Sequence, residues 1–359
     1  MTTASPSRTT LLETIETQRF GCELSGSPLY SEVLDAVAHD VASDGPCAAL
    51  LDPLAEAPFG DAVLLRFLGA LHLLALDGRA PALAAHYPST GGTPHRGLAA
   101  AVVTTARDQA EVIGPELLRG VQTNEVGRSA SLLGGYLELA RLGHPLRLLE
   151  FGASAGLNLN VDRYRYETSH GAIGPADSPL VFNEPWFGGC PDLGLALDIV
   201  ERRGSDIDPI DAATVAGRLR LRSFVWPDQA QRLARLDAAL DVAAAHPPRV
   251  DRSDAVSWLD GQLAEPAAGV TTVVVHSIVL QYLSPGARAG LLALLDDAGR
   301  RATADAPLAW LRLEPGGDQA ELRLTTWPGA EVHLLATSSY HGPPVVWRMP
   351  PGGVVRRRG

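Results

Sequence analysis

The feature that most constrains the fold is a short apolar segment that runs into a turn of small residues. Leu146–Phe151 is an apolar run of strand length, and Gly-Ala-Ser-Ala-Gly follows it at 152–156. Such a run is typical of a buried strand in a parallel sheet that is covered on both faces. Small residues let the backbone approach a ligand closely, and the amides at the start of the next helix can point at it. The segment therefore predicts an α/β domain with a ligand site after this strand.

Later segments repeat the alternation of strands and helices that such a domain requires. Further strands are expected at 199–207, 273–275 and 308–313, and helices at 157–166 and 291–298. The runs 321–327 and 331–337 flank Pro328-Gly329, a pattern typical of an antiparallel hairpin. These patterns predict a mostly parallel sheet that ends in a C-terminal antiparallel hairpin.

The first part of the chain has a different character. Residues 11 to 142 read as helices, including an apolar helix at 62–76 that Asp61 can cap. We expect an α-helical N-terminal domain at 1–142 and an α/β domain at 143–359. A Gly-, Pro- and aromatic-rich insertion at about 168–197 is a candidate lid. The helix at 62–76 is shorter than the ~20 residues of a membrane span, so we expect no membrane association.

Composition excludes several classes of function. The chain has 359 residues, 30 basic and 41 acidic, for a net charge of −11, which argues against nucleic acid as a partner. Every basic residue is arginine, so neither a Schiff-base lysine nor a phosphate-loop lysine is possible. Three widely spaced cysteines and a polar N-terminal segment favour a reducing, cytoplasmic environment.

The motif Glu-x-Gly-x-x-x-Gly at 150–156 resembles the first motif of class I S-adenosylmethionine (SAM)-dependent methyltransferases. The resemblance covers residues 146–347 and implies a seven-stranded, Rossmann-like methyltransferase sheet. It also implies that Glu150 lies near the methionyl amino group of SAM. The turn residues that would contact the cofactor are Gly152, Ala153, Ser154, Gly156 and Asn158. Ser154 stands where the family usually has a glycine.

Two later segments extend the resemblance. Asp206, with Asp208 as the reserve, stands where the family has an acidic residue that binds the ribose hydroxyls. Asp254 and Ala255 match the third-strand motif, which implies that Asp254 binds the adenine amino group. Asp254 is equally suited to cap the helix that follows it.

The acceptor side of the expected site is less clearly marked. His276 follows the fourth strand, at the rim where an acceptor would meet the methyl group, and is our candidate general base. Glu125 and Glu314 are the reserve bases. Asn124 or Thr123 can cap the helix that follows, and the alternative is that the start of this helix lies over the site. No metal site is expected, and we expect a small-molecule or protein acceptor that the sequence does not identify.

Two other functions remain open. Residues 152–156 also spell Gly-x-Ser-x-Gly, the nucleophile elbow of α/β-hydrolases, which would make Ser154 the nucleophile of an esterase or amidase. A protein of this fold can also bind a nucleoside or metabolite without methyl transfer. The whole chain also resembles a bacterial family that is known only as a domain of unknown function.

Overall fold

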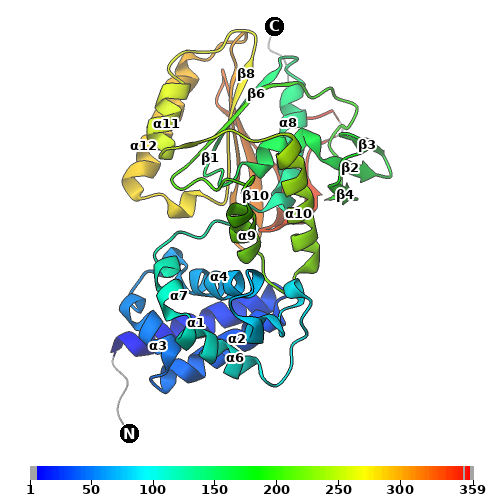
Figure 1. Cartoon of the computed structure of the whole chain (residues 1–359). Helices are drawn as coiled ribbons and strands as arrows, with labels where there is room; N and C mark the ends of the chain where they lie inside the picture. Colours follow the sequence, from blue (N-terminus) through cyan, green and yellow to red (C-terminus); the bar gives the residue numbers. More distant parts are fainter. Residues whose placement is uncertain (1–5, 351, 356–359) are drawn as a thin grey trace. The chain divides into compact units, whose positions relative to one another are not determined.

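The computed structural model describes residues 6–350 and 352–355 (Figure 1). The chain forms two compact units, and each is built from separate stretches of sequence. The helical unit takes the residues up to Thr123 together with Thr214–Ala234, and the α/β unit takes Asn124–Ala213 and the residues from Arg235 onward. This division differs from the predicted boundary between 142 and 143. The helix before the first strand belongs to the α/β unit because it packs against the sheet.

The helical unit consists of short helices around one apolar core. Its α-helices are α1 (Pro6–Leu24), α2 (Pro28–Ala42), α3 (Pro46–Leu51), α4 (Val63–Leu76), α5 (Pro81–Ala84), α6 (Leu98–Asp108), α7 (Ala110–Leu117) and α9 (Val215–Ser223). Single 3-10 turns lie at η1 (Asp52–Leu54), η2 (Phe59–Asp61) and η3 (Pro88–Thr90). Asp61 does not cap α4 as predicted. It belongs to η2, and the capping position is held by Ala62 in a left-handed conformation.

Helix α4 lies in the centre of this core. Among the described residues, one helical stretch, Phe59–Leu76, has the length and composition of a membrane span. Most of α4 is nevertheless buried against its neighbours, with Phe67, Leu71 and His72 fully inaccessible. His72 makes two hydrogen bonds: Nδ1 donates to Ser223 O at 3.1 Å, and Nε2 of the neutral ring accepts from Ser89 Oγ at 2.7 Å. This is the pattern of a core helix.

The α/β unit is built on a nine-stranded sheet in the order β5-β12-β11-β10-β9-β8-β1-β6-β7. Its parallel core consists of β1 (Leu146–Phe151), β6 (Ile199–Asp206), β7 (Val250–Arg252), β8 (Thr271–Ser277) and β9 (Leu308–Pro315). Every residue of β8 is buried, as expected for a central strand that is covered on both faces.

The antiparallel part of the sheet is larger than the predicted hairpin. After β9 the chain continues through β10 (Ala320–Trp327), β11 (Glu331–Ser339) and β12 (Gly342–Trp347) as an antiparallel meander. The two-residue strand β5 (Trp186–Phe187) pairs in parallel with β12. The predicted count of seven strands was therefore wrong. β12 contains Pro343 and Pro344, which weaken a strand signal, and β5 is too short to give one.

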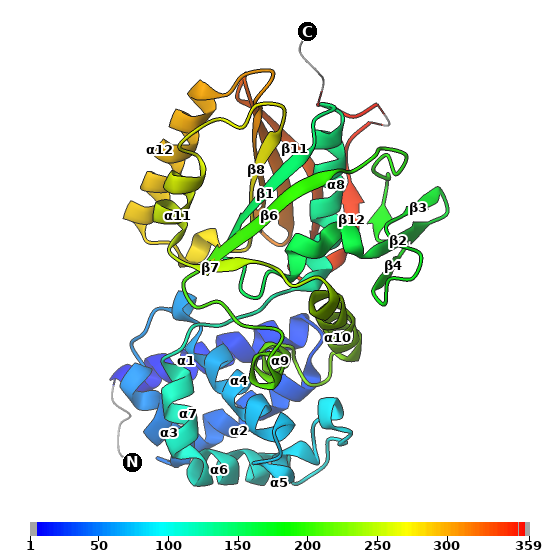
Figure 2. The same ribbon diagram turned by 45° about the horizontal axis from the view of Figure 1, so that its top comes forward.

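Helices cover the two faces of the sheet, as the views in Figures 1 and 2 both show. α8 (Ser129–Ala140) packs on the face that carries Leu148, Glu150 and Leu311, where Gly135 allows close contact with Leu311. α11 (Ala255–Gln262) and α12 (Pro285–Arg301) cover the opposite face, against Leu149 and Phe151. α10 (Ala230–Ala245) crosses the division between the two units.

The predicted helix at 157–166 is shorter in the structure. It is the 3-10 helix η5 (Leu157–Arg163), and it ends where β2 (Arg165–Thr168) begins. β2 pairs with β3 (Gly171–Ile173) and β4 (Val181–Asn183) in a small separate sheet. The insertion therefore contributes to a small sheet of its own. In this sheet Tyr166 of β2 stacks on Phe182 of β4, with ring centroids 4.9 Å apart. Trp186 Nε1 donates to Ala130 O at 3.1 Å, which fastens the insertion to the start of α8.

Candidate ligand site at the carboxyl edge of the sheet

The strand order reverses direction between β1 and β8. From β1 the chain first builds outward on one side, through β6 and β7, and then returns to build β8 and β9 on the other side. The chain after β1 and the chain after β8 therefore continue toward opposite edges of the sheet. In open parallel sheets, ligands bind in the crevice that this divergence leaves beyond the carboxyl ends of the strands.

The glycine-rich turn after β1 has a backbone that favours glycine. Gly152, Ser154 and Gly156 have φ angles of +64°, +53° and +73°. A Cβ atom on Gly152 would lie 2.6 Å from Val279 Cγ2, because the loop after β8 packs against the turn. Ser154 adopts this left-handed conformation without being glycine, which costs a residue with a Cβ atom some backbone strain.

Side chains from two other segments hold the amides of this turn. The Ser154 amide donates to Asp206 Oδ2 at 2.8 Å, and the Leu157 amide donates to Asn124 Oδ1 at 3.0 Å. Asn124 does not cap the following 3-10 helix, η4 (Val126–Arg128). Glu125 does so, by accepting a hydrogen bond from the Gly127 amide at 3.1 Å. The start of the helix that precedes β1 thus lies at the turn.

Glu150 is a buried carboxyl group at the end of β1. Glu150 is 3% exposed, and its Oε2 atom has no hydrogen-bond partner among the described residues. Burial raises the pKa of Glu150 to about 8, while the positive charge of Arg128 acts in the opposite direction. Arg128 is itself buried and donates to Ser277 O and to Tyr340 O, both at 3.0 Å.

The remaining turn residues of the prediction are buried. Ala153 is inaccessible and donates its amide to Ser205 O at 3.0 Å. Asn158 accepts a hydrogen bond from Ser129 Oγ at 2.7 Å and donates to Glu125 O at 3.4 Å. In this structure Asn158 therefore ties the turn to the start of α8.

Acidic residues after β6 and β7 lie further along the same edge. Asp206 accepts from the Asp208 amide at 2.9 Å through Oδ1, in addition to the Ser154 amide. Between them Ile207 is 73% exposed. Asp208 pairs with Arg252 at 2.7 Å.

Asp254 caps a helix, which is one of the two roles that the sequence allowed for it. It is exposed and caps α11 by accepting a hydrogen bond from the Ser257 amide at 3.0 Å. This bond is the main reason that the pKa of Asp254 is lowered. Ala255, the first residue of α11, is half-buried.

His276 occupies a different place from the predicted rim position. It is fully buried on the α11/α12 face of β8, where its ring stacks on Phe151 with centroids 4.4 Å apart. Nε2 accepts a hydrogen bond from Trp310 Nε1 at 3.0 Å. Because Trp310 can only donate, the proton of a neutral imidazole is on Nδ1, which lies 2.7 Å from Glu314 Oε1. Burial is the main reason that the pKa of His276 is lowered.

Glu314, at the end of β9, accepts the hydrogen bond from His276 Nδ1 through its Oε1 atom. The same Oε1 atom accepts from the Val279 amide at 2.8 Å and the Leu280 amide at 3.3 Å. Oε2 is buried and has no hydrogen-bond partner among the described residues. Glu314 and His276 lie on the sheet face opposite Glu150, because residues alternate between faces along each strand.

Arg128 and Ile207 were not predicted from the sequence as site residues. The signal for Arg128 was the polar run at 122–128 directly before a buried helix, which brings Asn124, Glu125 and Arg128 to one edge. Ile207 could have been noted as an apolar residue between two aspartates. Among the described residues, no group of three or more His, Cys, Asp or Glu side chains could hold a metal ion.

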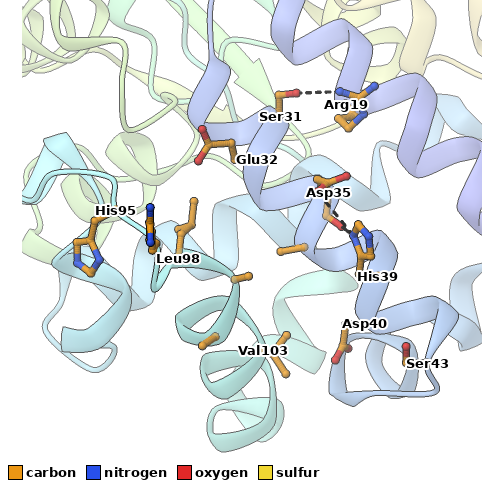
Figure 3. A pocket seen from close by; sticks show the side chains of 14 residues that line it. Arg19, Ser31, Glu32, Asp35, His39, Asp40, Ser43, His95, Leu98 and Val103 are labelled. Carbon is orange, nitrogen blue, oxygen red and sulfur yellow. Dashed lines mark hydrogen bonds and ion pairs between the residues drawn. The ribbon is translucent and has the colours of Figure 1, made fainter.

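A second concave surface lies in the helical unit. It is a groove of about 800 Å³ between α2 and α6, and its lining includes Glu32, Asp35 and Val103 (Figure 3). Several of its charged groups have protein partners, such as Arg19 with Glu16 at 2.6 Å. No residue that lines it carries a buried polar atom without a partner, in the part of the chain that the structure describes. The carboxyl edge of the sheet is therefore the stronger candidate for a ligand site.

The fold and this edge define a mixed α/β protein with a large, mostly parallel sheet and a separate helical unit. The chain belongs to the bacterial family described as "Uncharacterized protein conserved in bacteria (DUF2332)", whose model matches residues 13–347. No curated protein and no solved structure matched the chain.

Proposed function

We propose that this protein transfers a methyl group from SAM to a small-molecule or protein acceptor. The order of the five parallel strands, β7-β6-β1-β8-β9, supports the proposal. It corresponds to the order 3-2-1-4-5 of doubly wound sheets that bind nucleotide-containing cofactors. The glycine-rich turn follows the central strand β1, next to the point where the strand order reverses.

The observation that carries the proposal is the buried oxygen of Glu150 that lacks a partner. Leaving a buried acceptor unsatisfied costs about 1 to 3 kcal/mol, so such atoms call for an explanation. The ammonium group of a methionyl moiety would donate to Glu150 Oε2. The positive charge of Arg128, on the same side of the sheet, suits the carboxylate of the same moiety.

The adenosyl moiety has candidate partners along the same edge. Asp206 would accept hydrogen bonds from the ribose hydroxyls at the end of β6, and the exposed side chain of Ile207 offers an apolar surface to the flat base. Asp254 remains the candidate for the adenine amino group, since a capping carboxylate has further lone pairs to accept with.

When bound, SAM supplies a methyl group on a sulfonium centre, and transfer needs alignment and a dry site. Glu314 would accept the proton that an acceptor loses, because its Oε2 atom has no protein partner. His276 would hold Glu314 in place through the hydrogen bond from Nδ1. These roles replace the sequence-based assignment of His276 as the base. Glu125, which caps η4, would help to fix the wall of the site.

Two alternative functions can be tested against this proposal. A protein that binds SAM or a nucleoside without methyl transfer would bind ligand but give no turnover with any acceptor. A serine esterase is favoured only by the left-handed φ of Ser154 within Gly-x-Ser-x-Gly. Against it, Ser154 Oγ has no hydrogen-bond partner among the described residues, whereas a nucleophilic serine needs a histidine base.

Mass spectrometry of the purified protein for SAM or S-adenosylhomocysteine (SAH), followed by calorimetric titration with SAH, tests the proposal. We expect binding that Glu150→Gln weakens by about tenfold or more, as the loss of a charge-assisted hydrogen bond implies. Glu265→Gln is the matched control, since Glu265 is exposed and lies outside the site. Absence of both heat and thermal stabilisation at millimolar SAH would remove the proposal.

A further inference from the structure

The glycine-rich turn offers a ligand fewer amides than its sequence implies. In nucleotide-binding proteins, free amides at such a turn bind the phosphate groups. Here the amides of Ser154 and Leu157 already donate to side-chain oxygens, Asp206 Oδ2 and Asn124 Oδ1. Ala153 and Gly156 donate to backbone oxygens, Ser205 O at 3.0 Å and Ala153 O at 2.7 Å.

The two side chains act on the turn from different segments. Asp206 comes from the end of β6 and brings a carboxylate to the Ser154 amide, which disfavours any anion there. Asn124 comes from the segment before η4 and is neutral, so it occupies the Leu157 amide without adding charge. Leu157 is fully buried, which makes the replacement of this acceptor by water unfavourable.

The position of Asn124 is itself supported by neighbouring contacts. Asn158 Nδ2 donates to Glu125 O at 3.4 Å, and Ser129 Oγ donates to Asn158 Oδ1 at 2.7 Å. Glu125 fixes the next turn through the Gly127 amide. The segment that carries Asn124 is thus joined to the glycine-rich turn at two consecutive residues, Leu157 and Asn158.

We infer that Asn124 is a specificity-determining residue. Its Oδ1 atom accepts the hydrogen bond from the Leu157 amide that a phosphate oxygen would otherwise accept, and it so restricts the site to nucleoside ligands without phosphate. Together with Asp206 it would admit an adenosyl ligand and reject ADP or a dinucleotide. This inference rests on the proposed function for the identity of the accepted ligand, whereas the exclusion of phosphate rests on the hydrogen bonds that the amides of Ala153, Ser154, Gly156 and Leu157 already make.

Hydrogen exchange of the Leu157 amide tests the contact without any ligand. We expect Asn124→Ala to accelerate this exchange by at least tenfold, and Asn124→Asp, which keeps an oxygen in place, to leave it protected. Asn124→Ser, whose side chain is too short to reach, serves if the alanine variant does not fold. Asn183→Ala, at an exposed site in β4, is the control. Unchanged exchange at Leu157 in the folded alanine or serine variant would overturn the inference.

Calorimetry with SAH and with ADP then tests the specificity. Wild-type protein should bind SAH and give no heat with ADP. Asn124→Ala should lose about threefold to tenfold in SAH affinity, and Asn124→Asp should restore it to within about twofold. Binding of ADP as tight as that of SAH, or equal SAH affinity in wild type and Asn124→Ala, would refute the role of Asn124. Absence of SAH binding by wild type would refute the proposed function instead, while the exchange and ADP measurements would still decide the inference.

Discussion

Substituting Glu150 by glutamine should change how the stability of the protein depends on pH. The pKa of Glu150 is raised from 4.5 to about 8, chiefly by burial. A carboxyl group whose pKa is raised by folding contributes stability that is fully present below pH 4.5 and is lost as the pH rises through about 8. At 1.36 kcal/mol for each pH unit, the loss amounts to about 4 to 5 kcal/mol.

Urea denaturation at pH 5, 7 and 9 measures this loss. The wild-type protein should lose a few kcal/mol of unfolding free energy relative to Glu150→Gln between pH 5 and pH 9, because glutamine does not ionise. Glu265→Gln, an exposed control, should follow the wild type. Parallel curves for wild type and Glu150→Gln, within about 0.5 kcal/mol at all three pH values, would show that Glu150 is not buried as described.

The same carboxyl group should couple ligand binding to proton release. At pH 6.5 the Glu150 carboxyl of the free protein is protonated in roughly thirtyfold excess, if its pKa is about 8. A ligand ammonium group favours the ionised form, so SAH affinity should rise between pH 6 and pH 8. Calorimetry in two buffers of different ionisation enthalpy should report the release of about one proton, and Glu150→Gln should abolish it. Binding without proton release at pH 6.5 would place the ammonium group elsewhere.

Three further substitutions test the site. His276→Asn removes the acceptor of the Trp310 indole N–H and one of the three donors to Glu314 Oε1, so it should cost about 2 to 4 kcal/mol in a denaturation experiment while SAH affinity stays within about twofold. A stable variant that has lost SAH binding would contradict this. Ser154→Gly relieves the strain of a left-handed φ of +53° and should raise the free energy of unfolding by about 0.5 to 1 kcal/mol without loss of SAH binding. If a fluorophosphonate probe labels the wild type and this variant abolishes the labelling, the protein is a hydrolase instead. Asp206→Ala should weaken SAH binding by about tenfold to a hundredfold. Asp208→Ala, which breaks an exposed pair with Arg252, should change it by less than about threefold. The reverse order of effects would move the ribose contact to Asp208.

The elements that could be read from sequence are those with a local signal. The apolar run that became β1, the turn of small residues after it and the β-branched run of β8 are recognisable because their neighbours along the chain define them. The same holds for β10 and β11, which a short turn joins. β5 escaped prediction because its strand character depends on pairing with β12, about 160 residues away along the chain. β12 escaped prediction because Pro343 and Pro344 weaken its own strand signal.

The candidate site divides in the same way. Glu150, Gly152 and Asp206 stand at the ends of recognisable strands, so their position at one edge follows from the parallel arrangement of β1 and β6. The burial of His276 between Phe151 and Trp310 does not follow from its place at the end of a strand, because it depends on the face to which the side chain points and on what covers that face. The hydrogen bond from the Leu157 amide to Asn124 is equally invisible in the sequence. The sequence determined which polar groups end the strands, whereas tertiary packing decided which of their atoms remain without a partner, since a hydrogen bond between distant segments depends on distance in space and leaves no local pattern.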